Sequence, residues 1–123
     1  MTYRPITSRS WWSCAPNSTY NMWVNSSSSI SGEHLADARV QYQYAFDSGY
    51  NAPPNTRVIG RGTAIFIHCS EPAGNSLGPY THGCVAIPPA VIKRLFRALD
   101  PKLKPTCAIG TLRRGTGTAI WAY

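Results

Sequence analysis

The chain has few acidic residues: five Asp and Glu stand against twelve Lys and Arg, for a formal net charge of +7 over 123 residues. It also has no apolar run long enough to cross a bilayer, and its N-terminal segment MTYRPITSRSWW lacks the apolar stretch of a signal peptide. Charged residues make up only 14% and hydrophobic ones 43%, which excludes a disordered polyelectrolyte. We therefore expect one folded domain over residues 1–123, with no membrane span and no signal peptide.

Internal repeats, heptads and long basic runs are absent as well. A charge of +7 favours polyanionic partners such as nucleic acid, acidic lipid or anionic cell-wall polymers. The basic residues are scattered, however, and gather only in short groups such as Lys93-Arg94 and Arg113-Arg114. Nucleic acid is therefore not expected as a partner.

Two segments read as β-strands. Arg39 to Phe46 alternates apolar and polar residues, which predicts a half-buried strand, and Gly62 to Cys69 is apolar on both faces, which predicts a central strand. In the second segment His68 lies on the opposite face from Cys69, because neighbouring residues of a strand alternate. Thr106 to Ile109 is a further candidate strand.

One segment reads as a helix. Apolar residues at Ile92, Leu95, Phe96 and Leu99 have helical spacing after Pro88-Pro89, which suits a first helical turn, and Asp100-Pro101 should end it. The expected fold class is mainly β with one or two short helices.

The remaining segments read as loops. The aromatic stretch from Trp11 to Trp23 is expected to be an irregular loop whose rings cover a core, and the serine run Asn25 to Ser31 a surface loop. Asn51 to Asn55, with two prolines, and Glu71 to Pro79 are also expected to be loops. The tail from Arg113 has no assignable pattern.

The residues that carry chemistry are two pairs, His68-Cys69 and His82-Cys84. With Cys14 and Cys107, the four cysteines allow three disulfide pairings, and spacing does not choose one. His68, Cys69, His82 and Cys84 are also suitable zinc ligands, but His68 and Cys69 should face opposite sides of one strand, and no C-x-x-C pair is present.

The third interpretation makes Cys84 a nucleophile. A thiolate is the reactive form, so a base that takes the thiol proton would activate it, and His68 on a rigid central strand is suited to this. Gly83 permits a tight turn that exposes the sulfur, and the N–H groups of Gly83 and Cys84 could face a developing oxyanion. A buried histidine with a purely structural role is the competing interpretation of His68.

IFIHC, a Gly/Pro-rich loop and THGCV together resemble the signature of the L,D-transpeptidase catalytic domain (YkuD-like) family, in which a His precedes a [Ser/Thr]-His-Gly-Cys motif. WWSCAPNSTYN, GEHL, YNAPPNTRVIGRGTAIFIHC and GCVAIPPAVIKRLFRALDPKLKPTCAIG look like an actinobacterial-type branch. The resemblance covers about residues 11–110.

The resemblance implies a mixed, bent sheet and a cysteine acyltransferase acting on peptidoglycan stem peptides. Cys84 would attack the amide before the terminal D-Ala, D-Ala would leave, and the thioester would pass to a side-chain amine. His68 would be the base, its other ring nitrogen held by a backbone carbonyl, with that of Cys69 in position for this. His82 and Gly83 would shape the turn and oxyanion hole.

The resemblance also assigns Thr81 as the leading hydroxyl of the motif, and we take Thr81 and Tyr50 as candidate substrate-binding residues. Glu33, His34 and the Trp11-Trp12 pair are further candidates for the cleft, with structural roles as the alternative. No metal or organic cofactor is implied. The expected state is a monomer.

Two departures from the family pattern stand out. Many members carry Arg or Asn two positions after the nucleophile, where this chain has Ala86. The Gly-rich early strands that normally precede this part are not recognised, so we expect a sheet that is incomplete at its N-terminal side.

The resemblance places the protein in the cell wall or another extracytoplasmic location. Alternative functions are a truncated, non-catalytic or wall-binding remnant of the family and a generic cysteine peptidase or amidase. Carboxypeptidase action would follow if water replaced the acceptor amine.

Overall fold

The structure, a computed structural model, describes residues 3–38, 40–54, 56–71 and 81–110. These residues form two three-stranded sheets, one α-helix and two short 3-10 helices. The predicted mainly β class is confirmed. Arg39, Asn55, residues 72–79 of the predicted loop and the tail from Arg113 lie outside the described residues.

The first sheet has the order β2-β1-β3 and is antiparallel throughout. Its strands are β1 (Ser10–Ser13), β2 (Met22–Asn25) and β3 (Gly32–His34). The loop predicted from Trp11 to Trp23 is wrong at its two ends, because Trp12 pairs with Trp23 on one side and with Glu33 on the other. Residues 14–21 do form turns and loop, and the rings of Trp12 and Tyr20 are buried in the core as predicted. Gly32 is required here, since a Cβ at this position would lie 2.2 Å from the Trp12 carbonyl oxygen.

The second sheet has the order β4-β5-β6. Its strands are β4 (Ala45–Asp47), β5 (Phe66–Cys69) and β6 (Val85–Ile87). The central position predicted for β5 is confirmed, and the sheet is mixed: β5 runs antiparallel to β4 and parallel to β6. Regular pairing begins at Phe66 rather than Gly62, because Gly62 and Ala64 have positive φ values of 99° and 56°.

The strand predicted from Arg39 to Phe46 is wrong for most of its length. Gln41–Gln43 form a 3-10 helix, η1, in which the Tyr42 N–H donates to the Ala38 carbonyl, and only the end of the segment pairs, as β4. Tertiary packing explains the difference. The Tyr42 ring makes edge contacts with Phe66 and His68, so packing outweighs the alternating pattern.

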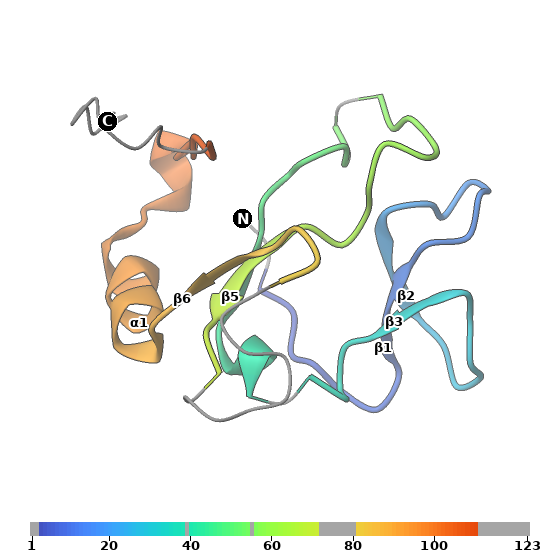
Figure 1. Cartoon of the computed structure of the whole chain (residues 1–123), viewed down its shortest axis with the longest axis horizontal. Helices are drawn as coiled ribbons and strands as arrows, with labels where there is room; N and C mark the ends of the chain where they lie inside the picture. Colours follow the sequence, from blue (N-terminus) through green and yellow to red (C-terminus); the bar gives the residue numbers. More distant parts are fainter. Residues whose placement is uncertain (1–2, 39, 55, 72–80, 111–123) are drawn as a thin grey trace.

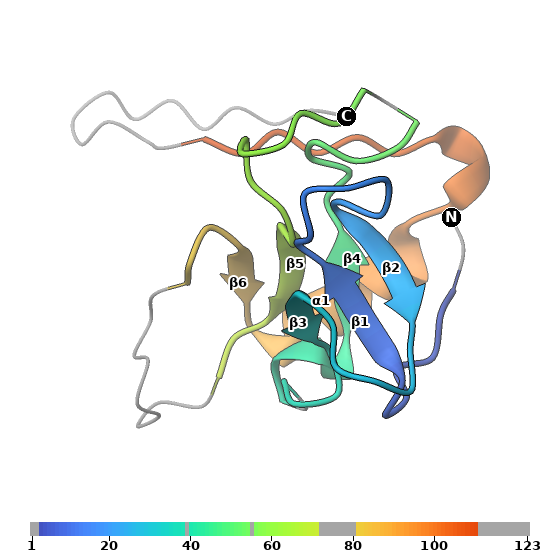
Figure 2. The same cartoon turned by 90° about the vertical axis from the view of Figure 1, so that its right-hand side faces the viewer.

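Hydrophobic cores lie on both faces of β5. Trp12, Leu35 and Phe66 form one core, between the two sheets, and Phe46, Cys69 and Ile92 form the other, against the helix. Figures 1 and 2 show the resulting layers: the first sheet, the second sheet and then the helix. The alternation predicted along β5 is therefore confirmed, with Phe66 and Cys69 in different cores.

The predicted helix is confirmed as α1 (Pro89–Ala98), with Pro89 in its first turn and Leu99 at its C-cap. Ile92 is fully buried against the second sheet, and such burial contributes about 1.5–3 kcal/mol. After a short 3-10 helix, η2 (Pro101–Leu103), the chain extends. The strand predicted at Thr106–Ile109 is wrong: these residues are exposed and unpaired within the described structure.

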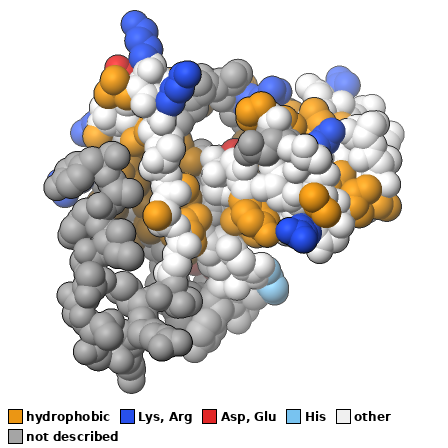
Figure 3. All heavy atoms as spheres, turned by 90° about the horizontal axis from the view of Figure 1, so that it is seen from above, with side chains coloured by type: hydrophobic (Ala, Val, Ile, Leu, Met, Phe, Trp, Pro, Cys, Tyr) orange, Lys and Arg blue, Asp and Glu red, His pale blue; other side chains and the backbone are white. Residues whose placement is uncertain are grey.

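The surface shows how the positive charge is distributed. On the face seen in Figure 3, Lys and Arg side chains lie apart, between hydrophobic and uncharged groups, rather than in one stripe. Among the described residues, no helix has the length and apolar character needed to cross a membrane.

Candidate active site

A cavity of about 290 Å³, here called the Cys84 cavity, lies on the face of the second sheet that meets the first. It brings together residues of β3, η1, β5, the segment before β5 and the turn before β6. They are Glu33, Ala38, Gln41, Tyr42, Thr63, Ala64, His68, Thr81, His82 and Cys84. Four of the six site residues predicted from the sequence therefore line one cavity.

Cys84 and His68 share a face of the sheet because of the parallel register between β5 and β6. His68 lies opposite Ala86, and Cys84 is two residues before Ala86, so all three side chains point to the same side. Ala86, at the position where the family pattern often has Arg or Asn, therefore lies next to His68 and contributes only a methyl group.

His68 is held in one orientation. It is 7% exposed, and its Nδ1 donates to the carbonyl oxygen of Cys69 at 2.8 Å, as the family resemblance implies. A carbonyl can only accept, so Nδ1 carries the proton and Nε2 of the neutral ring is left as an acceptor. The Tyr42 ring packs edge-on against the imidazole, with centroids 5.6 Å apart. This histidine can accept a proton without rearranging.

The Cys84 sulfur is held by the backbone that leads into β5. Its Sγ donates to the Ala64 carbonyl at 3.3 Å and accepts from the Phe66 N–H at 3.4 Å. Burial raises the pKa of the Cys84 thiol above its ordinary value; the Phe66 N–H partly offsets this, and the Glu33 carboxylate raises it further. The resting group is thus a thiol, which needs a base to become a nucleophile.

The turn before Cys84 depends on Gly83, whose φ is +125°. A Cβ there would be strained and would lie 3.2 Å from Ile65 Cδ1. Thr81 closes the turn, since its Oγ1 donates to the Cys84 carbonyl at 2.6 Å and accepts from the Gly83 N–H at 3.3 Å. In this state the Gly83 N–H is directed at Thr81.

The other predicted site residues lie in different places. His82 lines the Cys84 cavity and is exposed. Tyr50 does not line it: the Tyr50 side chain is about half exposed, and its hydroxyl donates to the Arg61 carbonyl at 2.8 Å. Glu33 lines the cavity, where it accepts a hydrogen bond from the Tyr42 hydroxyl.

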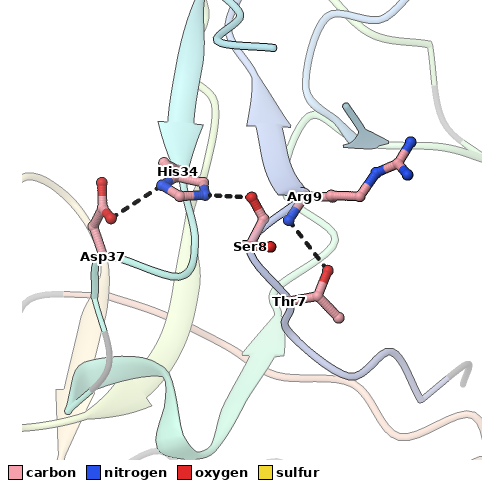
Figure 4. Close-up of polar contacts among 5 residues, drawn as sticks. All are labelled: Thr7, Ser8, Arg9, His34 and Asp37. Atoms are coloured by element: carbon pink, nitrogen blue, oxygen red, sulfur yellow. Dashed lines mark hydrogen bonds and ion pairs between the residues drawn. The ribbon is translucent and has the colours of Figure 1, made fainter. Parts of the chain in front are cut away.

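His34 and the tryptophan pair lie away from the cavity lining. Figure 4 shows His34 between Asp37 and the Ser8 carbonyl, each 3.0 Å from a ring nitrogen. The same ring stacks on Trp11, with centroids 4.4 Å apart, while Trp12 is buried in the core. These contacts indicate structural roles.

Tyr42 is a cavity residue that the sequence does not reveal, because the alternating pattern from Arg39 to Phe46 assigns it to the face of a strand. Its hydroxyl reaches Glu33, and its ring lies against both His68 and Phe66. Burial raises the pKa of Tyr42 above its ordinary value, and the hydrogen bond to Glu33 adds to this. The Tyr42 hydroxyl therefore stays protonated and acts as a donor.

Asn21, also missed, is a buried polar hub beside the cavity. Its Oδ1 accepts from Trp12 Nε1, Thr63 Oγ1 and the Ala64 N–H, at 2.7, 2.9 and 3.0 Å. Its Nδ2 donates to the Tyr50 and Asn51 carbonyls. Asn21 thereby ties the first sheet to the segment that holds the Cys84 sulfur. Its local pattern in the sequence is that of an ordinary turn residue.

The metal and disulfide interpretations find no support in the geometry. Cys69 is fully buried in the core beside α1, on the opposite side of β5 from His68. Within the described ranges, no group of three or more His, Cys, Asp and Glu side chains is placed to hold a metal. Cys14, Cys69, Cys84 and Cys107 all carry free thiols.

Comparison with known proteins agrees with the motif. A family model described as the L,D-transpeptidase catalytic domain, YkuD, matches residues 2–118. No curated protein and no solved structure matches the chain. Because the family model spans both sheets, the helix and every residue of the Cys84 cavity, the chain belongs to the L,D-transpeptidase catalytic domain family.

Proposed function

We propose that the protein is a cysteine-dependent L,D-transpeptidase that acts on peptidoglycan stem peptides. The observation that carries the proposal is the shared placement of two groups in one cavity: the Cys84 thiol, and the His68 imidazole fixed by the Cys69 carbonyl. Family membership supplies the reaction class, an acyl transfer.

The first half of the reaction forms an acyl-enzyme. His68 Nε2 takes the Cys84 proton, and Sγ attacks the carbonyl of the amide between the diamino acid and the terminal D-Ala. The C–N bond breaks as the protonated His68 returns its proton to the leaving amine, so D-Ala departs and a thioester remains. One imidazole thus acts first as base and then as acid.

The second half transfers the acyl group. An amine of another stem attacks the thioester carbonyl, the C–S bond breaks, and Sγ recovers a proton by way of His68. If water attacks instead, the result is carboxypeptidase action. The cross-link therefore depends on how well an amine competes with water in the cavity.

Developing negative charge on the carbonyl oxygen requires donors. We assign this role to the N–H groups of Gly83 and Cys84, with the exposed His82 beside them. The Gly83 N–H would leave Thr81 Oγ1, a contact of 3.3 Å, to reach the oxyanion. Thr81 holds the turn through its hydrogen bond to the Cys84 carbonyl. Tyr50 supports the segment around Arg61, through its hydrogen bond to the Arg61 carbonyl, rather than the cavity wall.

The wider setting follows from the family. We propose a monomeric single catalytic domain over residues 1–123, of the actinobacterial-type branch, acting in the cell wall outside the cytoplasm. A net charge of +7 suits contact with an anionic wall polymer.

The direct test is covalent labelling of the nucleophile. The purified chain is incubated with a carbapenem, and its intact mass and tryptic peptides are measured. We expect one adduct, on the peptide that contains Cys84, and no adduct in Cys84→Ala. An unlabelled chain, or an adduct that survives in Cys84→Ala, would overturn the proposal.

A second assay separates transpeptidation from other cysteine chemistry. With a tetrapeptide stem as donor, the expected products are free D-Ala and an amide-linked dimer, both detected by mass spectrometry. Cleavage at another bond without D-Ala release would favour a generic cysteine amidase. Neither cleavage nor acylation would favour a non-catalytic, wall-binding member of the family.

A further inference from the structure

The Cys84 cavity is lined by an acidic residue, Glu33, although the protein as a whole is basic. Among the described residues that line it, Glu33 is the one acid, and none is Lys or Arg. The chain as a whole carries +7, with only five acidic residues. A negatively charged group therefore lies beside the nucleophile of a protein whose overall charge is positive.

The Glu33 carboxylate has a fixed position. Glu33 lies in β3, paired with Trp12 of the central strand, and its Oε1 accepts from the Tyr42 hydroxyl. The Tyr42 ring in turn packs against His68 and Phe66. A carboxylate accepts about four hydrogen bonds, so Glu33 retains capacity for a second, cationic donor.

The charge of Glu33 does not help the thiol ionise, since this carboxylate is one of the groups that raise the pKa of Cys84. The hydrogen bond from Tyr42 does not require a charge either, because a neutral amide oxygen at the same position would also accept it. What a carboxylate adds is attraction for a cation. A cation bound at Glu33 would also offset the unfavourable effect of Glu33 on the Cys84 thiolate, the group that leaves when the thioester is cleaved.

The proposed reaction supplies such a cation. Its acceptor is a primary amine, which is an ammonium ion at neutral pH, while the departing D-Ala has already left the cavity. We propose that Glu33, held by Tyr42, is the acceptor-binding group, which receives the side-chain ammonium of a diamino-acid residue beside the acyl-enzyme. This inference rests on the proposed function and names the group that selects amine over water.

The protons balance along this route. The ammonium gives up one proton to solvent through His68, and the neutral amine then attacks the thioester carbonyl. The C–N bond forms, the C–S bond breaks, and the second proton of the nitrogen reaches Sγ through His68. Cys84 returns to its thiol form, and no oxidant or further reactant is needed.

The test compares two acceptors on the same acyl-enzyme. A tetrapeptide stem serves as donor, with either Nα-acetyl-lysine amide, a cation, or methoxyamine, a neutral amine, as acceptor. In Glu33→Gln the concentration of the lysine acceptor that gives half-maximal product should rise by about tenfold, the loss of one charge-assisted contact. The methoxyamine value should change by less than about twofold.

Asp37→Asn is the matched control, because it makes the same change in net charge at an exposed acid outside the cavity lining. In Asp37→Asn the half-maximal concentrations of both acceptors should stay the same as in the unaltered chain. Tyr42→Phe provides a second variant if Glu33→Gln folds poorly: it keeps the ring and the charge but releases the carboxylate, and should weaken use of the lysine acceptor alone.

Two results separate failure of the inference from failure of the function. In the first, the unaltered chain forms an acyl-enzyme, but Glu33→Gln changes the half-maximal concentrations of both acceptors equally or changes neither. The acceptor role of Glu33 is then overturned, while the transpeptidase proposal stands. If the unaltered chain forms no acyl-enzyme, the proposed function is overturned and the inference falls with it.

Discussion

The carbonyl oxygen of Ala64 accepts a hydrogen bond from the Cys84 thiol, with Sγ and oxygen 3.3 Å apart. Ala64 has a φ of +56°, a conformation that costs a non-glycine residue about 1–2 kcal/mol. Its N–H is held by Asn21. The resting state of the nucleophile therefore depends on a strained backbone segment that a buried asparagine keeps in place.

The protonation of Cys84 gives a first prediction. Because burial raises the pKa of its thiol, the thiolate fraction at neutral pH should be smaller than in a free cysteine, for which the pKa is about 8.5. Alkylation of Cys84 by iodoacetamide, followed by peptide mass mapping, should reach half its maximal rate above that pH. Stability should correspondingly fall as pH rises from that ordinary value toward the raised one, since only the unfolded thiol ionises there.

Cys107 is exposed, so its alkylation, measured in the same peptide digest, shows that the iodoacetamide is active in each sample. Unfolding in urea should increase the rate at Cys84 near neutral pH. A midpoint at or below that of a free cysteine would contradict the protonated resting state.

His68→Gln removes the base. The rate of Cys84 acylation by a carbapenem should fall by about 10²–10⁴-fold, the usual contribution of general acid–base catalysis. The matched control is His34→Gln, a histidine that bridges Asp37 and Ser8 away from the cavity. Equal rates in the two variants would remove His68 from the mechanism; circular dichroism checks that both are folded.

Gly83→Ala tests the turn that presents the nucleophile. Alanine at a φ of +125° should lower the free energy of unfolding by about 1–3 kcal/mol, and its contact with Ile65 should displace Cys84 and slow acylation. Gly60→Ala is the control, because Gly60 also has a positive φ, +86°, but open space around its Cβ position. Urea titration should show destabilisation in both variants, with slower acylation in Gly83→Ala alone.

Asn21→Ala tests the polar hub. It leaves the buried Trp12 N–H without its acceptor, so the free energy of unfolding should fall by about 3 kcal/mol. Release of the Ala64 segment should also expose the Cys84 sulfur and move its alkylation midpoint toward the value of a free cysteine. Urea titration and the alkylation profile measure the two effects.

The control for Asn21 is Leu95→Ala, which removes packing on the α1 side of the second sheet and should cost about 2 kcal/mol. This variant should leave the alkylation midpoint of Cys84 unchanged. If the alkylation midpoint of Cys84 is also unchanged in Asn21→Ala, then Asn21 has a structural role only and does not hold the Cys84 thiol in its resting state.

Much of the local structure could be predicted from the sequence. Pro89 and the spacing of Ile92 and Leu95 correctly predicted α1, and the apolar run ending at Cys69 correctly predicted a central strand. These predictions succeed because helix starts and strand alternation are properties of neighbouring residues. The segment Arg39 to Phe46 failed because contacts of Tyr42 with distant residues outweigh its alternating pattern.

The sequence by itself determined the chemistry that is available: a cysteine after a flexible glycine, a histidine on a central strand, and a motif that identifies the family. Only the tertiary structure decided which side chains meet. The parallel register of β5 with β6 puts Cys84 on the face of His68, and packing between the sheets brings Glu33 and Tyr42 to the same cavity. Such contacts join residues far apart in the chain, so their energies depend on the whole fold and leave no local pattern to read.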